Sequence, residues 1–322
     1  MNFTKVKLLI CLCLLVVNGI FFALCVRLLS EKYYLSEQEA ELAQRNLAQN
    51  GVNVNIGKEE RRLYDLPIYD AQNGSEEKSI SEAYRAITES FFDSTVPEDA
   101  YVKTPDGYSV SVKNNDGYVL GSSLVTDDLY FECCYEYAAS EMEMADISKI
   151  PDRSTLYTEK DDDHDIARKF VDRALKNYNM KFVFRGSKQQ GDGRIVFFSG
   201  ELSDTEVSDI YINVCVKDGN VIYCGGRITD RAPQKKYSAD LVDSIDALYI
   251  LYDYLREGAE KNLAREISVE DITMTYRAYR YDQGKYYIIP TWVIEYTDID
   301  GVSHTATTDA INGESISVVQ KG

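Results

Sequence analysis

Residues 209–227 read DIYINVCVKDGNVIYCGGR. Two runs rich in β-branched and aromatic residues flank the dipeptide Asp218-Gly219, and an Asp-Gly pair in that position is a strong signal for a two-residue hairpin turn. We therefore predict two antiparallel strands, Asp209–Lys217 and Asn220–Arg227. A connection this short excludes the crossover that a parallel pair of strands needs.

The predicted hairpin carries two cysteines, Cys215 and Cys224. A two-residue turn pairs Val216 with Val221 and sets the cysteines diagonally on one face of the sheet, so a bridge between them is geometrically disfavoured. Seven cysteines in 322 residues do not make a disulfide scaffold. The sequence does not determine the oxidation state of Cys215 and Cys224.

Helical patterns occur on both sides of the hairpin. Ser36 followed by Glu39 is a capping box, which predicts the start of a helix that ends at Asn50-Gly51. Apolar residues at helical spacing predict three more helices. These are Ile80–Phe92, a helix with its apolar stripe from Ile166 to Tyr178, and Ala239–Glu257.

Further strands are predicted by alternating or apolar runs that are bounded by turn residues. They are Val52–Ile56, Tyr108–Lys113, Tyr118–Leu124, Leu129–Tyr135, Phe182–Arg185, Arg194–Ser199, Ile272–Arg280, Lys285–Tyr296, Ser303–Thr308 and Ser315–Val319. One helix followed by an antiparallel meander recurs about three times, which is typical of the α+β class with helices on one face of each sheet. Parallel βαβ winding is not supported, because successive strands are joined by short turns.

An apolar run covers Leu8–Leu29, long enough to cross a hydrocarbon core of about 30 Å once. A cleaved signal peptide or a lipoprotein signal is the alternative, but Leu24-Cys25 is a poor processing site for both. We therefore predict a retained transmembrane helix. Basic residues balance on its two sides, so charge counting does not decide the topology. The short leading tail favours a cytoplasmic N-terminus, with residues 31–322 outside the cytoplasm.

The predicted organisation is one N-terminal transmembrane helix followed by repeated helix-plus-antiparallel-sheet units. A polar stretch around Ser148–Asp163 marks the boundary between the two predicted α+β domains. The segments are a tail and anchor at residues 1–30, an α+β domain at 31–155, and a C-terminal α+β domain at 156–322 with sub-units at about 160–230 and 235–322.

The net charge and the hydrophobic content of the chain limit the classes of partner that we expect. A formal net charge of −18 argues against nucleic acid or anionic lipid, because both require clustered cations. The hydrophobic content of 44% is sufficient for packed cores, so disorder is not expected. We expect a membrane-anchored protein whose partners are other proteins.

No pattern indicates catalysis. The acidic run around His164 lacks the glycine and the final glutamate of an EF-hand loop, and the N-terminus of a helix explains it. His304 has no cysteine or acid at ligand spacing on its strand face, and Asp298 and Asp300 frame a turn. No phosphate loop, nucleophile elbow or dinucleotide fingerprint is present. We predict a protein that is not an enzyme and that needs no metal ion and no cofactor.

The C-terminal region combines YYIIPTWVIE at 286–295, Asp300-Gly301, and DAINGE at 309–314. This combination resembles the closing hairpin and turn of PepSY-like modules. In physical terms a proline marks a strand irregularity, the only tryptophan is a core anchor, and an Asn-Gly pair supplies a tight turn. The residues of this structural motif are Pro290, Trp292, Asp309, Asn312 and Gly313.

The hairpin 210–227, the helix from Ser238 and the segment 267–281 occur in the order found in the YycI branch of the YycH/YycI regulators. The resemblance covers about residues 160–320. Members of this family are single-span, extracytoplasmic accessory regulators of an essential cell-wall sensor histidine kinase in Gram-positive bacteria. The resemblance therefore implies PepSY-like units, no catalysis, and a kinase and a related YycH-like protein as partners.

Because the family contacts its kinase through transmembrane helices, the resemblance implies a contact through the predicted span, with Asn18, Gly19 and Phe22 as candidate residues. An amide in lipid gains from an interhelical hydrogen bond, and a glycine permits close approach of two helices. We expect these residues to contact the partner. The alternative is a tethered PepSY-like binding or protease-inhibitor-like surface module that acts independently of a kinase.

Overall fold

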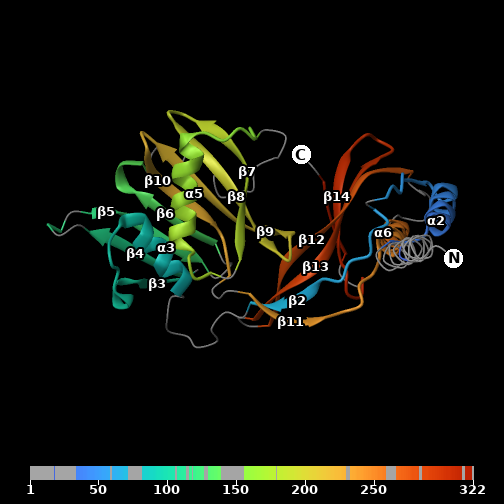
Figure 1. The fold of residues 1–322 in the computed structure, drawn as a ribbon, viewed down its shortest axis with the longest axis horizontal. Coiled ribbons are helices and arrows are strands. Elements are labelled where there is room, and N and C mark those ends of the chain that lie inside the picture. The colour runs from blue at the N-terminus through green and yellow to red at the C-terminus, as the bar shows by residue number, and fades with distance from the viewer. Residues whose placement is uncertain are drawn as a thin grey trace, which may run out of the picture. The chain divides into compact units, whose positions relative to one another are not determined.

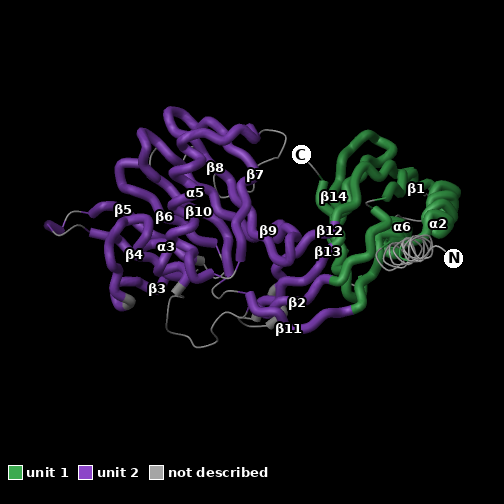
Figure 2. Tube along the Cα trace, in the orientation of Figure 1, with its two compact units in different colours: residues 1–65, 240–273, 292–322 green, residues 66–239, 274–291 purple. Residues whose placement is uncertain are grey.

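The computed structural model describes residue 18 and the ranges 34–58, 60–71, 82–105, 107–113, 116–117, 119–126, 130–138, 156–178, 180–229, 233–258, 266–282, 285–313 and 316–320 (Figure 1). The chain forms two compact units (Figure 2). Unit 1 comprises residues 1–65, 240–273 and 292–322, and unit 2 comprises residues 66–239 and 274–291. Each unit is therefore assembled from segments that are distant in the sequence.

Unit 2 is built on strands that follow one hydrogen-bonded order, from β11 through β2, β13, β12, β9, β10, β6, β5 and β4 to β3. The bounds are β2 Pro67–Asp70, β3 Val102–Thr104, β4 Gly107–Lys113, β5 Val119–Thr126, β6 Tyr130–Tyr135, β9 Thr205–Lys217, β10 Asn220–Arg227, β11 Gln234–Ser238, β12 Ile267–Asp282 and β13 Lys285–Asp298. The long β9 also pairs with β8 Gly193–Leu202, which pairs with β7 Lys181–Gln190.

Two helices lie on one face of this sheet, α3 Glu82–Phe92 and α5 Asp162–Ala174 (Figure 1). They contact each other; α3 also contacts β5 and β6, and α5 contacts β8, β9 and β10. The 3-10 turns η1 Glu98–Ala100 and η2 Glu136–Ala138 precede β3 and follow β6. Ile87 of α3 and large apolar side chains of the sheet, including Phe131, Phe198, Ile210 and Ile212, are almost completely buried.

The acidic residues around His164 form the N-terminus of helix α5. The side chain of Asp161 caps the helix by accepting the backbone N–H of His164 at 3.0 Å. Acidic residues fill the first turn, where the positive end of the helix dipole favours them. The predicted explanation of the acidic run as a helix N-terminus is confirmed.

Unit 1 contains α2 Glu37–Gln49, β1 Val52–Asn53, α6 Ser244–Gly258, β14 Ser303–Asp309 and β15 Ile316–Gln320, with parts of β12 and β13. The capping box is present as predicted: Ser36 Oγ accepts the N–H of Glu39 at 3.2 Å, and the Glu39 carboxylate accepts the N–H of Ser36 at 3.0 Å. Strand β14 pairs with β13 and β15, and β1 pairs in parallel with β12.

The predicted fold class of repeated helix-plus-sheet units is wrong, because the described residues are mostly β-sheet and strands of different predicted units join in one ladder. Strand β6 precedes the predicted boundary at residue 155 and β10 follows it, yet the two pair over Tyr130–Cys134 and Tyr223–Arg227. The pairing satisfies the backbone groups that an isolated meander would leave open at its edge. Parallel pairing also occurs, between β12 and β9.

The predicted transmembrane helix also needs correction. Within the ranges that the structure describes, no helix is both long enough and apolar enough to span a membrane. The run Leu8–Leu29 lies outside those ranges except for Asn18, which is helical and exposed. The helices that the structure describes thus do not support the predicted single-pass anchor or the extracytoplasmic location that depended on it.

Candidate functional site

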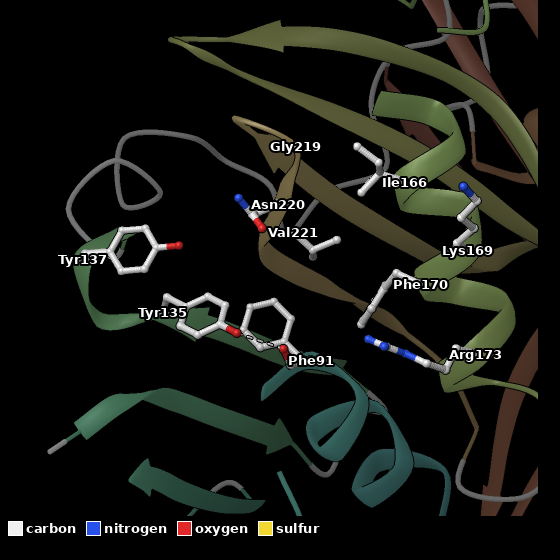
Figure 3. A pocket seen from close by; sticks show the side chains of 10 residues that line it. All are labelled: Phe91, Tyr135, Tyr137, Ile166, Lys169, Phe170, Arg173, Gly219, Asn220 and Val221. Carbon is white, nitrogen blue, oxygen red and sulfur yellow. Dashed lines mark hydrogen bonds between the residues drawn. The ribbon is translucent and has the colours of Figure 1, made fainter. Parts of the chain in front are cut away.

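Unit 2 contains a cavity of about 450 Å³ on the face that carries the helices (Figure 3). Its lining comes from four places: the end of α3, the end of β6 with η2, the outer part of α5, and the turn between β9 and β10. The residues that line it are Phe91, Tyr135, Tyr137, Ile166, Lys169, Phe170, Arg173, Gly219, Asn220 and Val221.

Aromatic rings form one wall of the cavity. The Tyr135 ring lies 4.8 Å from the Phe91 ring and is stacked on Tyr137 with centroids 5.5 Å apart. Phe170 of α5 meets Phe91 edge-on at 6.2 Å. Phe91 and Phe170 are buried, whereas 66% of Tyr137 is exposed. The wall therefore runs from the core of unit 2 out to solvent.

Helix α5 supplies the opposite side. Ile166, Lys169, Phe170 and Arg173 are spaced by three, four and seven residues, which places them on one helical face. Lys169 and Arg173 are exposed, and neither forms an ion pair with another residue that the structure describes. Arg173 donates one hydrogen bond to the backbone carbonyl of Ser90 at 2.6 Å, which holds its guanidinium beside the cavity.

The rim is completed by the predicted hairpin turn. Lys217 pairs with Asn220, and Val216 with Val221, as the two-residue turn required. Gly219 has a φ of 76°, a left-handed conformation that glycine adopts without steric cost. The Asn220 side chain donates to the carbonyl of Asp218 at 3.0 Å, so the turn is held in a defined conformation.

The electrostatics of the cavity combine a neutral phenol with two cations. Burial raises the pKa of Tyr135, with smaller contributions from Tyr137 and Asp93, and Arg173 opposes the rise. The phenol is therefore neutral at pH 7 and acts as a donor, here to the carbonyl of Phe91 at 3.1 Å. The lining contains no histidine, cysteine or carboxylate. The arrangement is suited to binding a group that has an apolar or aromatic body and a negative charge.

The residues predicted from the sequence lie elsewhere. Trp292 of β13 is only 1% exposed, donates its indole N–H to the Val242 carbonyl at 2.8 Å, and meets Tyr64 edge-on. Pro290 is buried in the same strand. Of the predicted partner-contact residues, Gly19 and Phe22 lie outside the described ranges.

The C-terminal turn of the motif has a clear local geometry. The buried carboxylate of Asp309 accepts the N–H groups of Ile311 at 3.1 Å and Asn312 at 3.0 Å. Gly313 has a φ of 70°. These residues and Trp292 belong to unit 1, and none of them lines the cavity of unit 2.

Both histidines serve packing or turn geometry. His164 is buried at the start of α5, with its ring 4.6 Å from that of Phe184. His304 contacts Asp298 with its Nε2 atom 2.8 Å from the carboxylate, which also accepts the N–H of Asp300 at 3.0 Å. The hydrogen bond from His304 lowers the pKa of Asp298. The described part of the chain contains no group of three or more His, Cys, Asp and Glu side chains that could hold a metal ion.

Comparisons with known proteins add little to this geometry. No protein-family model matches the chain, and no curated protein matches it. Among solved structures, it is similar to the crystal structure of an uncharacterized protein from Eubacterium rectale ATCC 33656. The TM-score is 0.47 and the identity 12%, with 84% of this chain and 91% of the other covered.

Proposed function

We propose that this chain is a non-catalytic regulatory protein that binds an acidic segment of a partner protein in the cavity of unit 2. The observation that carries the proposal is a cavity with an aromatic wall and two cations on a chain whose net charge is −18. A chain so negative repels acidic partners over most of its surface. Lys169 and Arg173 provide a local exception, so they favour one docking position.

The aromatic wall supports a peptide segment as the ligand. Tyrosine side chains combine a large apolar surface with a polar tip, which is why they are enriched where proteins bind each other. A volume of about 450 Å³ is within the range of specific binding pockets and holds a few side chains. An acidic residue beside an aromatic or aliphatic one would place its carboxylate near Lys169 and its apolar part against Tyr135.

The class of partner protein follows from the resemblance of the sequence to the YycI branch. The YycI-like order of the hairpin, helix and strands in the second half of the chain supports a two-component sensor histidine kinase as the partner, with a YycH-like protein as a second one. The mechanism is a shift of the kinase between states by unequal binding to them. The proposal requires only the contact in unit 2 and makes no use of a membrane segment.

Lys169→Glu tests the cavity directly. The substitution removes the attraction between Lys169 and a ligand carboxylate and replaces it with repulsion between two carboxylates, and each contribution is about 0.5–1 kcal/mol at an exposed position. The affinity for an acidic ligand should therefore fall about tenfold. The probe is a fluorescein-labelled hexapeptide of alternating glutamate and phenylalanine, and the readout is fluorescence anisotropy at low salt.

Lys176→Glu is the matched control, because Lys176 is an exposed lysine just beyond the end of α5 and does not line the cavity. It changes the net charge by the same amount and should alter the affinity by less than about twofold. Equal losses in the two variants would show that total charge, and not the cavity, governs binding. No binding by the unaltered chain would contradict the proposal.

The kinase assignment has a separate test. When the full chain is co-expressed with the sensor kinases of its own genome, one kinase should co-purify with the unaltered chain and with Lys176→Glu, and recovery with Lys169→Glu should fall severalfold. Recovery of no kinase, together with retained peptide binding, would reject the kinase and favour a binding module that acts independently of one.

A further inference from the structure

Cys133 of β6 and Cys224 of β10 lie directly opposite each other in an antiparallel strand pair. Side chains of directly opposite residues point to the same face of the sheet. Their Cα atoms are about 4.5–5.5 Å apart in either type of antiparallel pair, and disulfides span Cα separations of about 4.4–6.8 Å. The strand register therefore places the two cysteines on one face of the sheet, at a Cα separation that a disulfide can span.

The two thiols are deeply buried, with Cys133 1% and Cys224 0% exposed. Burial raises the pKa of Cys133 to about 12. Burial also raises the pKa of Cys224, and the neighbouring Cys133 raises it further, as expected for two thiols on the same face of the sheet. Both thiols are free in this structure, and Cys133 donates to the hydroxyl of Ser123 at 3.4 Å.

We propose that Cys133 and Cys224 form an intramolecular disulfide between β6 and β10 when the chain folds in the presence of a small-molecule disulfide or a thiol–disulfide oxidoreductase. The first protein thiolate attacks a sulfur of the external disulfide, forms a mixed disulfide and releases one thiol. The second protein thiolate then attacks the protein sulfur of the mixed disulfide and releases the other thiol. Two protein thiols are oxidised, one external disulfide is reduced to two thiols, and the two protons pass to the leaving groups.

Folding is the stage at which this exchange can take place. The attacking species is the thiolate, and a thiolate needs access to the external disulfide. In the folded chain both requirements fail, because the thiols are buried and protonated. While β10 docks onto β6, the thiols are still accessible and are already brought together. Once formed, the bridge is shielded from external reductants by the same burial.

The other two cysteines of unit 2 provide internal controls. Tyr223 is the strand partner of both Cys134 and Cys215, so its side chain stands between them on the opposite face of the sheet. These three residues belong to one buried cluster. A bulge between Val221 and Tyr223 shifts the hairpin register by one residue. Cys215 and Cys224 therefore point to opposite faces, and the bridge considered from the sequence cannot form.

The test is oxidative refolding followed by disulfide mapping. The reduced, unfolded full chain is refolded in a mixture of oxidised and reduced glutathione, alkylated in denaturant, and digested with trypsin without reduction. Peptide 218–227 contains only Cys224, peptide 114–149 contains Cys133 and Cys134, and peptide 195–217 contains Cys215. We expect 218–227 to be linked to 114–149, with the loss of two hydrogen atoms.

Single alanine variants assign the bond. The link should persist in Cys134→Ala and Cys215→Ala and disappear in Cys133→Ala and Cys224→Ala. The proposal is overturned if the unaltered chain refolds to its native circular dichroism spectrum with peptide 218–227 alkylated and unlinked. It is also overturned if that peptide is linked to 195–217, or if the link survives in Cys133→Ala.

Discussion

Gly226→Ala is expected to lower the free energy of unfolding of unit 2 by about 3 kcal/mol, at the upper end of what overpacking of a well-packed site costs. A Cβ at this position would lie 2.2 Å from the carbonyl oxygen of Tyr211 and 3.0 Å from the Cα of Ile212. Both are backbone atoms of the neighbouring strand β9, so no side-chain rotation relieves the clash. The strands β9 and β10 would have to move apart, and urea unfolding followed by far-UV circular dichroism measures the loss.

Gly57→Ala is the matched control for this change. The added methyl there meets only the end of the flexible Glu60 side chain, at 2.7 Å, and Gly57 does not have a left-handed φ. We expect a change within about 0.5 kcal/mol. Equal stability of the Gly226 and Gly57 variants would contradict the tight approach of β9 and β10 that the structure describes.

Trp292→Ala is expected to destabilise unit 1 by about 3–5 kcal/mol, the usual cost of removing a fully buried large aromatic ring. The indole fills the space beside Tyr64, and its N–H satisfies the carbonyl of Val242 just before α6. Since Trp292 is the only tryptophan, unfolding must again be followed by circular dichroism and not by tryptophan fluorescence.

Trp292→Phe separates the two contributions of this side chain. The phenyl ring retains most of the apolar contact but leaves the Val242 carbonyl without the indole donor, which costs about 1–3 kcal/mol for a buried group. The phenylalanine variant should therefore lie between the unaltered chain and the alanine variant. A phenylalanine variant as unstable as the alanine variant would mean that the hydrogen bond dominates, and no loss in either would refute the role of Trp292 as a core anchor.

Local features of the fold were predictable from the sequence. The Asp218-Gly219 turn, the capping box at Ser36 and the acidic start of α5 each depend on a few neighbouring residues, and each is present. The bulge near Ile222 was not predictable, because its sequence fits a regular strand equally well. That single inserted residue changes the strand face of Cys224, and hence which cysteine lies opposite it.

Long-range pairing was not predictable, and it determines the architecture. The patterns of β6 and β10 identify both as strands but carry no information about which edges meet. The short strands β2, β3 and β11 were missed, since Pro67–Asp70 lies in a charged stretch and Gln234–Ser238 is exposed throughout. Partner choice depends on packing of whole faces across the unit, which a single sequence does not reveal.

The candidate site was missed for a related reason. Lys169 and Arg173 occupy positions that are normal for the solvent face of an amphipathic helix. Only the fold brings the end of β6 and the turn of the hairpin to the same place, and Tyr135 then faces α5. The one local signal was the position of these two cations beside Ile166 and Phe170, and it does not distinguish a binding face from an ordinary exposed one.

Methyl NMR of the full chain, titrated with the glutamate–phenylalanine hexapeptide, tests the binding proposal most directly. We expect the methyl resonances of two lining residues, Ile166 of α5 and Val221 of β10, to shift in a saturable manner. Val102 is 64% exposed on β3 and does not line the cavity, so its resonances should not shift. Shifts at Val102 equal to those at Ile166, or no shift at Ile166 and Val221, would contradict a specific binding site for an acidic segment in unit 2.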